Sequence, residues 1–178
     1  MIDPVTRHIW TYRLIYLALG LLVIAYKLMP LGLGESGIPA PDILLALTLA
    51  WLMRQPAVVP MGAIILLFLL ADFLFQRPPG LWTLLVLVTS ESLRRRRAHM
   101  TEFPFLVEWG AFAAAVFALL ILNRVALWLL VVDQTTLGLT LAHGIVTVAV
   151  YPIVVAVSKF VFGLRKLGPI DSEAAASS

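Results

Sequence analysis

The sequence contains no cysteine among its 178 residues, and only 13% of its residues are charged. The absence of cysteine excludes disulfides, thiol nucleophiles and thiolate metal sites. The low charge excludes an ordinary soluble domain, in which about a quarter of the residues are charged. Hydrophobic residues instead make up 61% of the chain, and the mean hydropathy is +0.99. We therefore predict an all-α integral membrane protein that crosses the bilayer several times.

Polar stretches are short, so we assign residues 1–166 to a single polytopic membrane domain. Residues 167–178 are rich in small and polar residues and are typical of a disordered tail, which we place in the cytoplasm. The apolar run Leu14–Met29 is followed by Pro30 without a small-residue cleavage pattern, so we interpret it as a retained signal anchor. The isoelectric point of about 9.6 reflects basic residues that orient membrane helices, so we expect lipid contact and no nucleic-acid binding.

Six apolar segments are candidates for membrane spans, and crossing the hydrocarbon core takes roughly 20 helical residues. Two of them, Asp42–Met53 and Leu81–Leu93, fall short of this length. A helix of about 12 residues covers about 18 Å, so these segments either rely on neighbouring protein or do not cross fully. The longer segments are Leu14–Met29, Ala57–Phe75, Phe105–Leu122 and Thr135–Phe162.

Positive charge decides the orientation in part, because cytoplasmic loops of membrane proteins are enriched in Lys and Arg. Six spans with a cytoplasmic N-terminus place ten of the 13 Lys and Arg residues inside, and a four-span arrangement without the two short segments scores the same. A five-span arrangement that omits only the Asp42 segment would place the arginine run Arg94–Arg97 outside. We prefer about six spans, with both termini and the arginine run in the cytoplasm.

Motifs of catalysis and cofactor binding are lacking. GLGESG places Gly32, Gly34 and Gly37 at the spacing of a dinucleotide-binding loop, but it lies between two membrane segments instead of between a strand and a helix, so we interpret it as coincidental. The sequence has no HExxH, GxSxG or P-loop motif and no close cluster of acidic residues. We therefore expect no enzyme activity, no cofactor and no metal.

Two acidic residues lie near expected helix ends. Asp42 follows Pro41 and is either a binding or gating carboxylate at the membrane face or a helix-start acid that satisfies free N–H groups, and the second interpretation accounts for it. Glu91 precedes Arg94 and Arg95 by three and four residues, so we expect it to pair with them along one helix face. The arginine run is first a cytoplasmic stop attracted to anionic lipid, with an acidic protein partner as the alternative.

Small residues form a stripe in the segment Phe105–Leu122, where Gly110, Ala114 and Ala118 recur every four residues. Such a stripe lets two helix backbones approach closely in lipid, where van der Waals contact drives association. It predicts a packing face, used either within the chain or against a partner helix.

Glu108 and His143 are the ionisable residues most out of place in long apolar segments, and such residues are functional candidates by default. Glu108 is one turn from the start of its segment and can reach the interface. His143 fits a proton relay, a metal site or a neutral hydrogen bond to another helix, and we favour the hydrogen bond.

The segment LLADFLFQRPPGLW predicts a rigid hairpin between two membrane helices. Asp72 lies late in the first helix, and the Pro-Pro-Gly break that ends at Gly80 cannot continue it. An Asp72–Arg77 ion pair is one way to hold this turn. Trp82 follows as a candidate aromatic anchor at the membrane interface.

Residues Pro41–Trp82 resemble the rod shape-determining protein MreD family. The resemblance rests on a Pro-Asp pair that opens a Leu-rich helix, an Arg-x-Pro after that helix, an acidic residue late in the next helix and a Gln-x-Pro-x-Gly-Leu hairpin. LNRVAL and YPIVV further along the chain support it, and the layout agrees over about residues 10–165.

This resemblance implies a non-enzymatic inner-membrane scaffold of the cell-elongation machinery. Members act with the single-span protein MreC, the actin-like MreB and a glycosyltransferase–transpeptidase pair that makes peptidoglycan. We therefore expect an MreC-like partner, with an MreB-like filament and the wall synthases as further partners. Asp42, Asp72, Arg77 and Gly80 are the residues expected to organise the protein.

One alternative function stays open, because the family is also similar in fold to the substrate-binding subunits of energy-coupling-factor vitamin transporters. A small-molecule-binding subunit of this type predicts a cavity among the helices. Convergent polar groups such as Asp42, Glu108 and His143 would line it.

Overall fold

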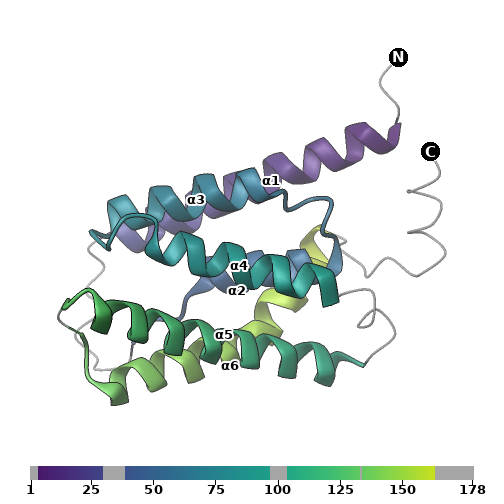
Figure 1. The fold of residues 1–178 in the computed structure, drawn as a ribbon. Coiled ribbons are helices and arrows are strands. Elements are labelled where there is room, and N and C mark those ends of the chain that lie inside the picture. Colours follow the sequence, from purple (N-terminus) through teal and green to yellow (C-terminus); the bar gives the residue numbers. More distant parts are fainter. Residues whose placement is uncertain (1–3, 30–38, 97–103, 133, 163–178) are drawn as a thin grey trace.

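The computed structural model describes residues 4–29, 39–96, 104–132 and 134–162, and these form six α-helices (Figure 1). The glycine-rich motif at residues 32–37, Arg97 and the predicted tail at residues 167–178 lie outside the described residues. The helices are α1 (Pro4–Leu28), α2 (Ile43–Arg54), α3 (Met61–Leu74), α4 (Leu81–Arg96), α5 (Phe105–Leu129) and α6 (Leu137–Phe162).

Three helical stretches are long and apolar enough to cross a membrane, namely Ile9–Leu28 of α1, Phe105–Leu129 of α5 and Leu137–Val161 of α6. The apolar helices α2 and α3 are shorter, with 12 and 14 residues. The predicted all-α fold is confirmed for the described residues. The described residues thus form six helices, three of which are long and apolar enough to span a bilayer.

Several helix boundaries differ from those of the expected segments. Helix α1 begins at Pro4 instead of Leu14, and α4 continues beyond Leu93 to Arg96. The third helix begins at Met61 instead of Ala57, because Pro60 occupies its N-cap and the preceding residues form a turn. The fifth helix continues to Leu129, beyond the apolar segment that was expected to end at Leu122. In this added stretch, the Arg124 guanidinium donates to the carbonyl of Thr135, which precedes α6, at 3.0 Å.

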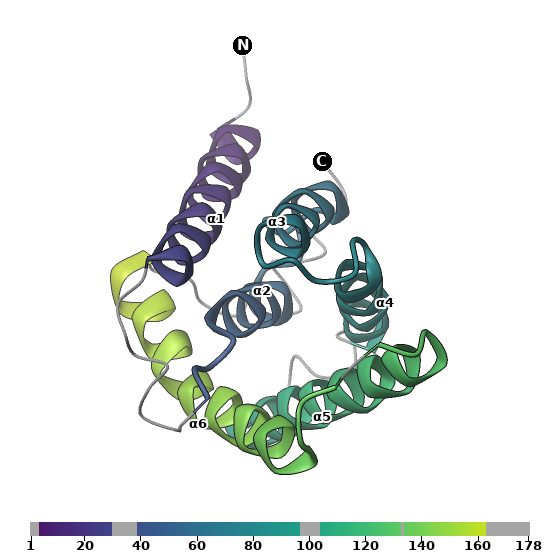
Figure 2. The ribbon, with the colours of Figure 1, turned by 90° about the vertical axis from the view of Figure 1, so that its left-hand side faces the viewer.

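Helix α2 is the centre of the bundle. Figure 2, an end view, shows the other helices arranged around it, and it packs against α1, α4 and α6. Every residue from Leu44 to Arg54 is buried. A helix that is apolar on all sides is stable only when protein or lipid surrounds it. The short helix α2 is therefore surrounded by protein. This agrees with the expectation that the segment Asp42–Met53 relies on neighbouring protein.

Polar side chains of α2 bond to the neighbouring helices. The Trp51 indole Nε1 donates to Ser158 Oγ of α6 at 3.0 Å, and Thr48 Oγ1 lies 2.9 Å from the Tyr16 hydroxyl of α1. Trp51 also packs at a tilt against the ring of Tyr16, with centroids 5.9 Å apart. Such contacts fix the rotation of each helix, because a polar group turned toward lipid would lose its partner.

Replacing Trp51 with alanine is expected to lower the free energy of unfolding by about 3–5 kcal/mol, because it leaves a cavity between α1, α2 and α6. Trp128→Ala is the matched control, since Trp128 lies on α5 and is 72% exposed. Thermal unfolding of both purified variants in the same detergent makes the comparison. Equal destabilisation by the two substitutions would contradict the central position of α2.

Candidate functional site

Asp72 closes the turn between α3 and α4. The side chain is fully buried, and its Oδ2 accepts hydrogen bonds from the Gly80 and Thr83 backbone N–H groups, each at 3.2 Å, and from Thr83 Oγ1 at 2.8 Å. A carboxylate is favoured here because the first N–H groups of a helix lack partners and the helix dipole is positive at this end. Asp72 is therefore a cap for α4 that is supplied by α3.

Arg77 does not form the ion pair with Asp72 that was one way to hold this turn. Its backbone N–H donates to the Asp72 carbonyl at 3.0 Å, whereas its guanidinium lies 5.6 Å from the ring centroids of both Phe75 and Trp82. The carboxylate is directed to the start of α4, so the guanidinium is free to stack on the two aromatic rings. The hairpin is thus held by backbone capping and cation–π contact.

Gly80 has a φ of +85°, a conformation that residues with a Cβ rarely adopt, so the turn requires glycine at this position. Trp82, expected as an anchor at the membrane interface, is instead buried, with 6% of its surface exposed. The rigid hairpin that the sequence predicts is therefore present, but its tryptophan points into the bundle.

Asp42 caps α2 in the way that the helix-start interpretation predicts. Its Oδ1 accepts from the Leu45 N–H at 3.2 Å, and its own backbone N–H donates to Thr147 Oγ1 of α6 at 3.0 Å. The residue is buried, with 5% exposed. Asp42 therefore starts the central helix and fixes that start against α6.

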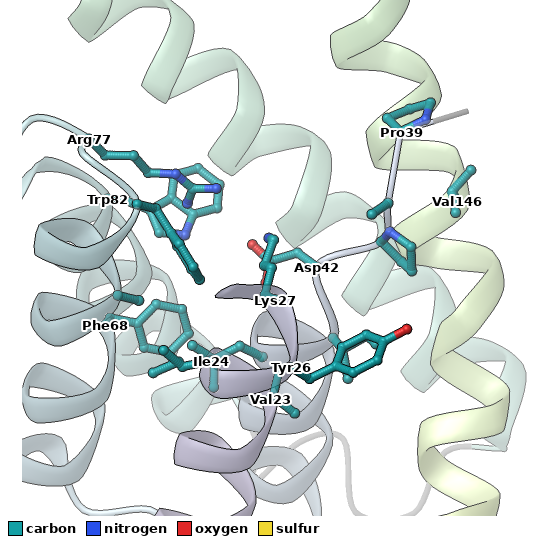
Figure 3. Close-up of a pocket in the computed structure, with 16 residues that line it drawn as sticks. Val23, Ile24, Tyr26, Lys27, Pro39, Asp42, Phe68, Arg77, Trp82 and Val146 are labelled. Atoms are coloured by element: carbon teal, nitrogen blue, oxygen red, sulfur yellow. The ribbon is translucent and has the colours of Figure 1, made fainter. Parts of the chain in front are cut away.

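Two neighbouring cavities, each of about 420 Å³, lie at the end of the bundle where α1 and α3 end and α2 and α4 begin. Four residues line both of them, namely Pro39, Asp42, Arg77 and Trp82. The first cavity, shown in Figure 3, is bounded mainly by apolar and aromatic side chains. A volume of this size is within the range of small-molecule sites.

His143 lines the second cavity, and its Nδ1 lies 2.9 Å from the Ala40 carbonyl that precedes α2. The favoured interpretation of a hydrogen bond to another helix is thus met only in part, because Ala40 lies in the segment before α2 and not on a helix. Within the described ranges, no group of three or more His, Cys, Asp and Glu side chains is placed to hold a metal ion.

Glu108 lies elsewhere, in a buried cluster that the sequence did not predict. It forms an ion pair with Arg54 at 3.4 Å and accepts a hydrogen bond from the Tyr151 hydroxyl at 2.8 Å. All three side chains are buried among the helices, so Glu108 is paired within the protein. The polar groups expected to converge in a transporter-like site therefore divide, with Asp42 and His143 at a cavity and Glu108 apart from it.

The arginine run also has a structural role. Glu91 pairs with Arg94 at 3.6 Å and with Arg95 at 3.1 Å, as its spacing predicts. Arg94 additionally donates to the Val59 carbonyl at 2.7 Å and to the Pro56 carbonyl at 3.3 Å. It thereby holds the turn between α2 and α3 against the end of α4.

The small-residue stripe of α5 faces away from the bundle. Gly110, Ala114 and Ala118 are exposed, and a Cβ placed on Gly110 would meet no atom within 4 Å. Close approach of α5 to α6 occurs instead at Gly144, where a Cβ would lie 2.8 Å from the Leu120 side chain. Among the described residues, the stripe therefore does not pack against another helix of the chain, which was one of its two expected uses.

In comparisons with known proteins, no protein-family model, curated protein or solved structure matches the chain. The class that the fold defines is an all-α six-helix protein with three helices long and apolar enough to span a membrane. Aspartate side chains cap the starts of α2 and α4, and two cavities lie at that end of the bundle.

Asp72→Ala is expected to lower the free energy of unfolding by about 1–3 kcal/mol for each buried donor that it leaves unpaired. Gly80→Ala is expected to cost about 1–2 kcal/mol, because alanine must adopt a positive φ. The matched control is Gly62→Ala, since Gly62 lies in α3 with open space around it. Chemical or thermal unfolding in detergent measures all three, and a Gly80→Ala variant as stable as Gly62→Ala would contradict the turn geometry.

Proposed function

We propose that this chain is a multi-pass inner-membrane scaffold of the MreD type, without enzyme activity, that binds a single-span MreC-like partner. Through that partner, an MreB-like filament and a glycosyltransferase–transpeptidase pair, it regulates peptidoglycan synthesis and cell shape. In this proposal all six helices cross the bilayer, and the shorter helices α2, α3 and α4 do so because the longer helices accompany them. The family resemblance over Pro41–Trp82 and the six-helix fold support the proposal.

The outward-facing stripe of α5 is the observation that carries the proposal. Its buried face already packs inside the bundle through Phe112, Val116 and Leu119, whereas the stripe Gly110, Ala114 and Ala118 contributes nothing to that packing. In lipid a stripe of small residues at four-residue spacing favours contact with another helix. A partner with a single membrane span offers one such helix.

The distribution of charge supports the proposed orientation. Arg13 donates to the Ala57 carbonyl and so lies at the same end as Arg94 and the α2–α3 turn. Arg54 and Lys159 line one further cavity at the ends of α2 and α6. The opposite end carries Lys27, Arg77 and Arg124 among the described residues. The more basic end is placed in the cytoplasm by the positive-inside rule.

Asp42, Asp72, Arg77 and Gly80 organise the scaffold in structural roles. The two aspartates start α2 and α4, and Gly80 permits the turn between α3 and α4.

A second candidate function is a small-molecule-binding membrane subunit of the energy-coupling-factor type. The cavities lined by Asp42, Arg77 and Trp82 favour it. The separate position of Glu108 with Arg54 disfavours the particular polar set that this function predicts.

Affinity purification of the tagged chain from native membranes in mild detergent tests the scaffold proposal. We expect a single-span protein with an extracytoplasmic domain to co-purify with the wild-type chain, and Ala114→Leu with Ala118→Leu to reduce its recovery at least about tenfold. The reason is that leucine keeps the two helix backbones apart.

The control is Ala149→Leu, which makes the same alanine-to-leucine change at one exposed position of α6 and should leave recovery unchanged. The amounts of the chain and of its partner are compared by quantitative mass spectrometry. Equal loss of partner in both variants, or recovery of ATPase subunits in place of a single-span protein, would contradict the scaffold proposal.

A further inference from the structure

The first cavity at the capped end of the bundle has an unusual charge arrangement. Lys27 Nζ lies 5.2 Å from the ring centroid of Phe75, and the Arg77 guanidinium carbon lies 5.6 Å from the same centroid. All three residues line the cavity. Within the described residues neither cation forms a salt bridge, so two positive charges share one aromatic ring. An anion between them would relieve their mutual repulsion.

Trp82 adds a hydrogen-bond donor to the same wall. Its side chain is buried, and its indole Nε1 has no hydrogen-bond partner in the part of the chain that the structure describes. A buried N–H group without a partner destabilises the folded state, so a bound acceptor is favoured here. Figure 3 shows Trp82 beside Arg77 at the cavity, so an acceptor bound near the guanidinium is placed to approach this indole.

Among the described residues that line this cavity, Asp42 carries the only carboxylate. Its Oδ1 caps α2 by accepting from Leu45, and among the described side chains the carboxylate forms no salt bridge with Lys27 or Arg77. The described lining therefore contains the two cations Lys27 and Arg77, the capping carboxylate of Asp42 and the unpaired indole N–H of Trp82.

The remaining walls are apolar. Ile24, Leu44, Phe68 and Val146 contribute aliphatic and aromatic surface to a space of about 420 Å³. Sites for small molecules combine such walls with a few polar groups that fix the orientation of the ligand. We infer that this cavity binds a small amphiphilic anion, with a carboxylate or phosphate head between Lys27, Arg77 and Trp82 and an apolar body against α1 and α3.

This inference goes beyond the scaffold function and does not depend on it. The partner surface lies on α5, whereas the cavity is formed by α1 to α4 with one residue of α6. A ligand of this class would act either as a regulator of the scaffold or as the cargo of a transport subunit. Its binding is measured on the purified chain without any partner, so the two proposals fail independently.

Binding is tested with 2-naphthoate, 2-naphthyl phosphate and the neutral analogue 2-naphthamide. Isothermal titration calorimetry on the full chain in detergent measures the affinity of each. We expect both anions to bind at least about tenfold more tightly than the amide, because charge-assisted hydrogen bonds are the stronger ones. Dihexanoyl-phosphatidylglycerol forms a separate arm. Tighter binding of this lipid than of the naphthyl anions identifies a lipid headgroup as the source of the anion.

Variants assign the binding to the cavity. Lys27→Gln and Arg77→Gln are each expected to weaken anion binding at least about tenfold, and Trp82→Phe to weaken it while keeping the aromatic wall. Arg95→Gln is the matched control, because it removes the same charge from an exposed side chain at the other end of α4. Lys27 is also exposed, so Lys27→Gln tests the site without disturbing the core.

Two results would overturn the inference. One is affinity for 2-naphthamide equal to that for both naphthyl anions and for the lipid. The other is anion binding by Lys27→Gln that matches binding by Arg95→Gln.

Discussion

The burial of α2 is the constraint on which the rest of the structure depends. A 12-residue helix with protein on every side cannot turn its polar groups to water, so each must find a partner inside the bundle. Asp42 accepts from the first turn, and the Gln55 N–H donates to the Trp51 carbonyl at the other end. Side-chain bonds from Thr48 and Trp51 then fix α1 and α6 in rotation around it.

Both ends of this central helix carry a charged residue, and the surroundings of the two residues differ. At the Arg54 end, the guanidinium is buried against Glu108, and Tyr151 completes the cluster. Breaking such a pair leaves a buried charge without a counterion, so the cluster specifies how α2, α5 and α6 meet. At the Asp42 end, Lys27 and Arg77 line a cavity and have no acidic salt-bridge partner among the described side chains.

Local patterns in the sequence predicted the features that depend on nearby residues. The cap at Asp42, the pairs of Glu91 with two arginines and the turn at Gly80 all follow from spacing and backbone preference. The sequence also predicted membrane-spanning helices from the length of its apolar segments. Three of the described helices are long and apolar enough to cross a bilayer.

Features that depend on helix rotation were not predictable from the sequence. In a soluble helix, the polar face marks the outside, but in this chain the outward and inward faces are both apolar. The stripe at Gly110 therefore gave no sign of which way it faces. The pairing of Glu108 with Arg54 joins residues that are distant in the sequence, and the only available sign was an arginine at the end of an apolar helix.

The central functional claim is that the outward face of α5 holds the membrane helix of a single-span partner. Because the chain has no cysteine, Ala114→Cys introduces one unique thiol on that face, and Ala149→Cys does the same on α6. Each variant is labelled in native membranes with a thiol-reactive benzophenone and irradiated, and the cross-linked proteins are identified by mass spectrometry. A single-span protein captured from position 114 and not from position 149 is the predicted result. Capture of only lipid or a second copy of the chain at position 114 would contradict the claim.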